Sequence, residues 1–183
     1  METGPLSPTD HELVSRARSG DRSALHTLVD RHARSLFTLA VRLVGQVADA
    51  EDVLQETFAG AFRSLATFRE QSSVKTWLTQ ILILQAAQYH RTRLRHPAGR
   101  LDGLDVPARS DGPAGPAVDL RLDLGSALLA LCQEHREVIV LRELQGMSYD
   151  EMALVLKVPR GTVESRLFRA RRQLQHLLKE YLL

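Results

Sequence analysis

Apolar residues recur every three to four positions along most of the chain, which is the spacing of amphipathic helices. We find no stretch of useful length in which apolar and polar residues alternate as they do in a half-buried strand. Residues 96–122 interrupt the helical pattern, because they are rich in Pro, Gly and Asp and cannot supply a packed core. The sequence therefore predicts an all-α protein with two helical domains, over residues 1–95 and 123–183, joined by a flexible linker over 96–122.

Four helices are expected in the N-terminal domain, and each has a recognisable start signal. Residues whose side-chain oxygens can accept hydrogen bonds from the first free backbone N–H groups stand before each apolar run. These predicted caps are Thr9, with Glu12 completing a capping box, Asp21, Asp49, and either Ser72 or Ser73. Gly45 is placed to end the second and longest helix.

The C-terminal domain contains a predicted helix, break and helix over residues 148–174. Ser148 and Glu151 form a capping box, so the first helix is expected to start at residue 149. Pro159 disfavours helical geometry at the residue before it, and Gly161 frees the backbone. A second helix is then expected to begin near Thr162. This arrangement is typical of helix-turn-helix units that bind DNA.

The second helix of this unit has an apolar stripe on one side and a basic surface on the other. The stripe, expected to face the core, consists of Val163, Leu167, Ala170 and Leu174. Residues 157–179 hold seven Lys and Arg residues and one acid, a net charge of +6 against +2 for the whole chain. A solvated basic surface is the simpler interpretation, but the break and the stripe favour DNA binding. The candidate DNA-binding residues are Arg160, Thr162, Glu164, Ser165, Arg166, Phe168, Arg169 and Arg172.

The third predicted helix begins with an acidic segment, residues 49–58, which holds four acids and no base. Asp49, Asp52 and Glu56 share one side of the helix, with Gln55 beside them. Acids near a helix N-terminus also complement the helix dipole, which is the simpler interpretation. DNA binding by this face is disfavoured because carboxylates repel phosphates. The functional alternative is a docking face for a basic protein partner.

Composition excludes several other classes of protein. Of 183 residues, 44% are hydrophobic and 5% aromatic, which suits small helical bundles. No apolar run approaches the ~20 residues that span a bilayer, and no secretory signal is recognisable, so we expect a cytoplasmic protein without membrane insertion. Cys132 is the only cysteine; its C-x-x-H spacing with His135 lacks a second ligand pair for zinc. No catalytic constellation is visible, and we expect neither enzymatic activity nor a cofactor or metal.

Three segments resemble a known family. DAEDVLQETF and FREQSSVKTWL, at residues 49–58 and 68–78, are similar to the second conserved region of extracytoplasmic-function (ECF) sigma factors. These proteins are promoter-recognition subunits of bacterial RNA polymerase. HREVIVLRELQGMSYDEMALVLKVPRGTVESRLFRARRQL, at residues 135–174, is similar to their fourth region. The resemblance covers about residues 23–95 and 126–182.

The resemblance implies roles for both domains. Asp49, Asp52, Gln55 and Glu56 would dock on the clamp coiled coil of core RNA polymerase. The loop over residues 68–73 and the helix after it would hold a flipped base of the minus-ten element and follow the DNA backbone. The residues implied there are Phe68, Arg69, Ser72, Ser73, Lys75, Trp77, Arg91, Arg93 and Arg95, although core packing is the simpler interpretation for Trp77. The helix-turn-helix would enter the major groove of the minus-thirty-five element, and its domain would also contact the polymerase flap. Family members are commonly controlled by an anti-sigma factor.

Two departures from the family pattern keep alternatives open. Ile83 and Leu84 stand where polar or basic residues are usual, so the fourth helix either packs against more protein or has a narrower DNA face. Glu164 stands where a base is frequent; it would accept from a cytosine amine or repel phosphate. The alternatives are a two-domain transcriptional regulator, which would not need the acidic helix, and an adaptor that binds polymerase without starting transcription.

Overall fold

The structure is a computed structural model that describes residues 8–95 and 124–179. These two ranges are helical and contain no strand, which confirms the all-α prediction. The elements are α1 (Asp10–Arg18), α2 (Arg22–Val44), α3 (Val47–Ser64), the 3₁₀ turn η1 (Leu65–Thr67), α4 (Val74–Arg95), helical residues 124–130, α6 (Gln133–Ile139), the π-helical turn η3 (Val140–Leu144), α7 (Tyr149–Leu156) and α8 (Arg160–Lys179). The predicted linker, residues 96–122, lies outside the described residues.

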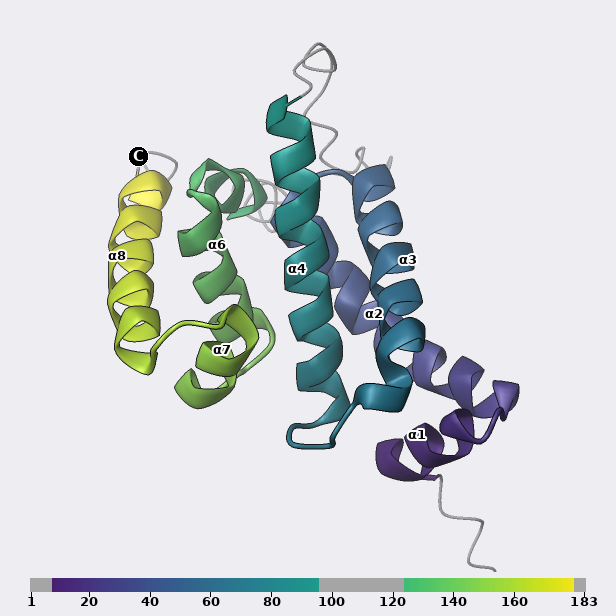
Figure 1. Ribbon diagram of the computed structural model, residues 1–183. Helices are drawn as coiled ribbons and strands as arrows, with labels where there is room; N and C mark the ends of the chain where they lie inside the picture. Colours follow the sequence, from purple (N-terminus) through teal and green to yellow (C-terminus); the bar gives the residue numbers. More distant parts are fainter. Residues whose placement is uncertain (1–7, 96–123, 180–183) are drawn as a thin grey trace, which may run out of the picture.

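The N-terminal domain is built from α1 to α4. Helices α2, α3 and α4 pack against one another, and α1 packs against α2 and η1 (Figure 1). Their common core includes fully buried leucines such as Leu13, Leu39 and Leu82. Because the predicted apolar faces are the ones that meet, periodicity alone accounts for this part of the fold.

Most of the predicted helix starts and stops are confirmed. The Thr9 hydroxyl accepts from the backbone N–H of Glu12 in a complete capping box, and Asp21 accepts from the first turn of α2. Gly45 ends α2 in the left-handed region, with φ 91°. Of the two candidate serines before α4, Ser73 is the cap, since its hydroxyl accepts from the Thr76 N–H at 3.1 Å.

The prediction that Asp49 caps α3 is wrong. The helix begins two residues earlier, at Val47, after Gln46 in an extended conformation without a side-chain cap. Asp49 thus lies inside the first turn. Its carboxylate bonds across the helix pair to Tyr89 and Arg93 of α4 rather than to its own backbone. A tertiary contact has replaced the local one that the sequence suggested.

In the C-terminal domain, α6 and α7 both pack against α8 (Figure 1). Leu141, Met152, Val163 and Leu167 are buried between them. The predicted inward stripe of the second helix is therefore confirmed at its first members. Among the described helices, none is both long and apolar enough to cross a lipid bilayer.

The two domains pack directly against each other. Helix α4 lies beside α7, and α2 contacts α6 and η3 (Figure 1). Ile83 is buried and Leu84 is 54% exposed, and both line a cleft of about 420 Å³ that α6, α7 and α8 also border. Packing against more protein therefore accounts for Ile83, whereas Leu84 remains largely exposed at the cleft. The relative placement of the domains was not predicted from the sequence.

One buried arginine joins the domains. The Arg136 guanidinium donates to the carbonyls of Leu128, Leu129 and Leu131 in its own domain. It also donates to the Leu43 carbonyl at the end of α2, with 2.5 Å between Nη1 and the oxygen. Beside this contact, a Cβ on Gly45 would lie 2.9 Å from Cδ2 of the Leu129 side chain. Glycine at position 45 therefore permits both the left-handed turn that ends α2 and the close approach of the two domains.

Candidate nucleic-acid interface

The helix-turn-helix forms as predicted, with a different break. The Ser148–Glu151 capping box is complete, and α7 ends at Leu156; the next residue, Lys157, is a non-glycine residue in the left-handed region with φ 54°. Helix α8 begins at Arg160 rather than near Thr162, because the Pro159 carbonyl already accepts from the backbone N–H groups of Thr162 and Val163 and so closes the first turn. Gly161 lies inside α8, so the backbone turns at Lys157 and not at the glycine.

The outer face of α8 carries exposed polar and aromatic side chains. Ser165, Arg169 and Arg172 are exposed, and the Phe168 side chain is 63% exposed. Thr162 is half-buried. A single helix whose inner stripe is anchored and whose outer face is open has the shape that fits a major groove.

The arginines of α8 differ in how they are held. Arg160 pairs with Asp150 and Glu164 and lies over the Tyr149 ring, and Arg166 bonds to Glu134 at 2.8 Å. The Arg172 guanidinium lies over the Phe168 ring. Among the described residues, no hydrogen bond or ion pair holds the Arg169 guanidinium. Arg169 is therefore the arginine of this face best placed to reach a base without breaking a contact.

Glu164 has a structural partner. Its carboxylate accepts from Arg160 Nε at 2.9 Å, an i,i+4 pair on the exposed surface of α8. Asp150 approaches the same guanidinium from α7. The pair orients Arg160 and offsets its charge. Neither of the two roles considered for Glu164 from the sequence included this contact.

The loop over residues 68–73 lies at the end of the N-terminal bundle, between η1 and α4. Phe68 is 7% exposed and stacks on Trp77, with ring centroids 4.4 Å apart. These two candidate residues form the floor of the loop rather than its open surface. Arg69 is exposed and Ser72 is half-buried, while Lys75 donates to the Gln145 carbonyl of the other domain.

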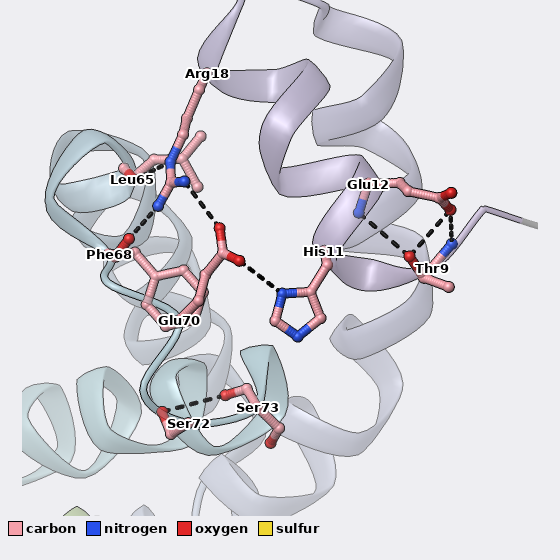
Figure 2. Close-up of polar contacts among 9 residues, drawn as sticks. All are labelled: Thr9, His11, Glu12, Arg18, Leu65, Phe68, Glu70, Ser72 and Ser73. Carbon is pink, nitrogen blue, oxygen red and sulfur yellow. Dashed lines mark hydrogen bonds and ion pairs between the residues drawn. The ribbon is translucent and has the colours of Figure 1, made fainter.

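Residues of α1 bind this loop, and sequence reasoning missed them. Arg18 donates to the Leu65 carbonyl, to the Phe68 carbonyl and to Glu70 (Figure 2). His11 bonds to the other carboxylate oxygen of Glu70 at 2.8 Å. The hydrogen bond from His11 and the charge of Arg18 hold the pKa of the Glu70 carboxyl below its usual range. No local pattern links residues this far apart in the chain.

The basic tip of α4 is partly engaged. Arg91 is exposed, and Arg95 is the last residue of the helix. Arg93 donates to Asp49 at 3.0 Å and to the Tyr89 hydroxyl, and its guanidinium lies over the Tyr89 ring. A residue expected on the DNA backbone is thus paired with a residue expected on the polymerase.

The acidic face of α3 is open except at that point and at Glu56, whose carboxylate lies 3.7 Å from Nη2 of Arg63 on the same helix. Asp52, Gln55 and Glu56 are exposed, whereas Asp49 accepts from Tyr89 and Arg93. Burial, followed by the hydrogen bond to Asp49, raises the pKa of Tyr89 to about 12, so its hydroxyl stays protonated and donating. A groove of about 230 Å³ runs between α3 and α4. It is lined by Asp52, Val53, Glu56, Gln85, Gln88, Tyr89 and Thr92.

The contact between the domains also holds a histidine that sequence reasoning missed. His90 Nε2 donates to the Leu43 carbonyl, which Arg136 binds as well. Burial, and then the nearby charges of Arg136 and Arg93, lower the pKa of His90. Across residues 8–95 and 124–179, no group of His, Cys, Asp and Glu has the arrangement of a metal site.

Two family models match the chain. The Sigma-70 region 2 model matches residues 28–96, and the Sigma-70 region 4 model matches residues 121–174. The first match contains α3, the loop and α4, and the second contains the helix-turn-helix. Each candidate surface therefore lies inside one of the two matches.

Curated relatives match over nearly their whole length. The ECF RNA polymerase sigma-E factor of Escherichia coli K12 is 35% identical over 174 residues, 89% of this chain and 91% of the relative. The RNA polymerase sigma-H factor of Pseudomonas aeruginosa is 33% identical over 186 residues, 93% of this chain and 96% of the relative.

Solved structures give the same result. CnrH, solved in complex with the cytosolic domain of CnrY, is 31% identical with a TM-score of 0.71; the match covers 93% of this chain and 97% of CnrH. The sigma factor RpoE of Bartonella quintana, solved with the anti-sigma factor NepR, is 28% identical with a TM-score of 0.71, covering 84% and 96%.

Proposed function

The chain belongs to the ECF sigma factors, and from that premise we propose which of its surfaces meets the polymerase and which meets each promoter element. As a sigma factor it works with RNA polymerase on promoter DNA in transcription initiation, and it is not an enzyme. What remains to be assigned is the role of each surface. The observation that carries our assignment is the separation of charge. Exposed Asp52 and Glu56 lie on α3, whereas exposed Arg169 and Arg172 lie on α8 without a hydrogen bond or ion pair to another described residue; the two helices are on different sides of α4 (Figure 1).

We assign the minus-thirty-five element to the outer face of α8. Ser165 and Arg169 are exposed at the centre of that face, where short polar and basic side chains reach base edges. Arg160 and Arg172 flank them and suit the phosphates on either side. Arg166 bonds to Glu134 on α6, so we assign it to fixing α8 against α6 and not to binding DNA.

We assign the melted minus-ten strand to the loop over residues 68–73. The loop is supported from below by Phe68 and Trp77, and Arg69 presents an unpaired charge to the strand. A splayed base needs a ring to stack on or a loop to hold it, and a nearby cation; this loop would offer its bent backbone and the exposed Arg69. Arg91 continues the basic track along α4.

We assign the polymerase clamp to the acidic face of α3 and the groove beside it. Asp52 and Glu56 line that groove and are exposed, so a basic side chain of the partner could enter between α3 and α4 and meet two carboxylates. The C-terminal domain would additionally contact the polymerase flap. As a polymerase subunit the protein would work in the cytoplasm.

The docking assignment is tested by reversing charge on α3. The double variant Asp52→Lys, Glu56→Lys should lower the affinity for core polymerase by roughly tenfold or more, because like charges would then face each other. Binding to an isolated minus-thirty-five duplex should stay unchanged. Glu51→Lys is the matched control, since Glu51 is also exposed but lies about 100° around the helix from Asp52. Normal polymerase capture by the double variant would overturn the docking assignment.

Control by an anti-sigma factor is part of the proposal. It is supported by the likeness to RpoE of Bartonella quintana, which is solved with the anti-sigma factor NepR. A partner that holds the sigma factor off the polymerase should compete with core polymerase in a binding assay. Simultaneous binding of both would contradict this mode of control.

A further inference from the structure

The loop assigned to the minus-ten strand contains a residue in a rarely adopted conformation. Glu70 has φ 57°, and within the described ranges it shares a positive φ only with Lys157 among non-glycine residues. A side chain with a Cβ makes this region of the backbone unfavourable, so the conformation persists only where the surroundings hold it. Such positions are concentrated in segments that bind ligands. The contacts that hold Glu70 are therefore of functional interest.

Two side chains of α1 supply those contacts (Figure 2). Arg18 Nη1 lies 2.9 Å from Glu70 Oε1, and His11 Nδ1 lies 2.8 Å from Oε2. The same Arg18 guanidinium donates to the carbonyls of Leu65, at 3.1 Å from Nε, and of Phe68. One planar group thus joins the backbone before the loop to the side chain at its turn, which the fork of an arginine can do and a lysine cannot.

Arg18 and His11, called the brace below, also change the charge that the loop presents to a DNA strand. Glu70 is the only acid in the loop, and a bare carboxylate there would repel the phosphates of a DNA strand. Arg18 and His11 occupy both of its oxygens and turn it toward α1. Arg69, next to it, has no ion-pair partner among the described residues and remains available to the strand.

The brace comes from outside the conserved-region match. The Sigma-70 region 2 model begins at residue 28, whereas His11 and Arg18 lie on α1. The loop itself lies within the match. The shape of the loop over residues 68–73 thus depends on residues that the family model does not include.

We propose that Arg18 and His11 are positioning residues for promoter recognition: through Glu70 they fix the loop over residues 68–73 in the shape that selects a base of the melted minus-ten strand. This inference rests on the assignment of the loop to that strand. The two residues do not touch the base. They act by holding the turn and by neutralising its one acid.

The test measures base preference by holoenzyme assembled from purified core polymerase. Run-off transcripts from a promoter library randomised at the minus-ten element are sequenced for wild type, Arg18→Ala, Arg18→Lys and the control Arg16→Ala. Arg16 lies on the same helix but pairs with Asp21 and not with the loop. A fourth variant, Gln71→Ala with Ser72→Ala, changes the loop directly. Polymerase affinity and binding to a minus-thirty-five duplex are measured alongside.

Arg18→Ala should lower the preference for the favoured base by roughly five- to tenfold, a large share of what one specific contact provides. Arg18→Lys should keep the overall yield, because its charge still faces Glu70, but should lose the preference. Arg16→Ala should behave as wild type. Polymerase affinity and duplex binding should not change in any variant, which separates positioning from a general loss of structure.

Two results would count against the proposal in different ways. If the loop variant changes base preference and Arg18→Ala does not, the brace is not a positioning device and the loop assignment stands. If neither changes it, the loop assignment fails and the inference fails with it. Should Arg18→Ala not fold, His11→Ala carries the test, because the His11 side chain is 58% exposed and, among the described residues, hydrogen-bonds to Glu70 alone; unaltered preference in that variant would also overturn the proposal.

Discussion

The two surfaces assigned to DNA are held in place in opposite ways. Helix α8 is held within its own domain: Arg160 is oriented by Glu164 four residues later and by Asp150 on the preceding helix, and Arg166 and Arg171 bond to Glu134 and Glu143, about thirty residues earlier. The loop over residues 68–73 is held by α1, whose Arg18 is about fifty residues away, and by a ring stack with Trp77.

This difference follows from what each element has to read. A duplex groove accepts a preformed helix, so helical periodicity and a few i,i+4 pairs are enough to present the side chains. A base lifted from a melted strand needs a pocket made of backbone that bends sharply. Such backbone is unfavourable by itself, and Glu70 keeps its left-handed conformation only through distant partners.

The largest expected effect concerns Arg169 of α8, which makes no hydrogen bond or ion pair to another described residue. Arg169→Ala should weaken binding to the preferred minus-thirty-five duplex by about 1–3 kcal/mol if the guanidinium reads a base. Thermal stability should not change, because Arg169 has no partner to lose within the described residues. Fluorescence anisotropy with matched and scrambled duplexes measures the first quantity, and calorimetry the second. Equal weakening on both duplexes would show a phosphate contact instead of base reading.

A smaller effect is expected from the local pair on the same helix. Glu164→Gln removes a negative charge beside the DNA and releases Arg160 from its i,i+4 contact. Binding to duplexes of any sequence should strengthen, and the slope of log affinity against log salt should steepen by about one unit. A salt titration at several ionic strengths measures this. An unchanged slope would mean that Arg160 contacts no phosphate.

The smallest effect is a structural change of the loop at acidic pH, at values where the helices stay folded. Because the pKa of Glu70 is lowered in the folded protein, its contribution is present above the ordinary carboxyl value of about 4.3 and is lost as pH falls below it. Trp77, the only tryptophan, stacks on Phe68 beneath the loop. Its fluorescence should therefore change in that acidic range before the helical circular dichroism does. Glu70→Gln should remove this early change; if it persists in the variant, another group is responsible.

Sequence reasoning reached the parts of the molecule that depend on neighbours. The capping boxes at Thr9 and Ser148, the stop at Gly45 and the buried stripe beginning at Val163 are all local patterns. The family was likewise recognisable, because its motifs are continuous segments. In the helix-turn-helix, the start of α8 at Arg160, the partner of Glu164 and the turn at Lys157 differed from expectation.

The rest could not be predicted because it depends on which helices meet. Asp49 looked like a cap until α4 supplied Tyr89 and Arg93 as partners. Phe68 and Lys75 had the right chemistry for DNA, but one is buried under the loop and the other bonds to Gln145 of the second domain. No spacing rule in one dimension relates residues so far apart along the chain.

The contact made by Arg136 has a consequence for chimeras that combine one domain of this protein with the other domain of a relative. Its four acceptors are backbone carbonyls, including that of Leu43 in the other domain. Main-chain oxygens are present whatever side chains surround them, and an arginine stays protonated at any pH the cell reaches. Most side-chain substitutions along α2 should therefore leave this hydrogen bond between the domains in place. Chimeras that graft the N-terminal half of a relative onto this C-terminal half should keep it, provided that the graft retains a glycine at position 45.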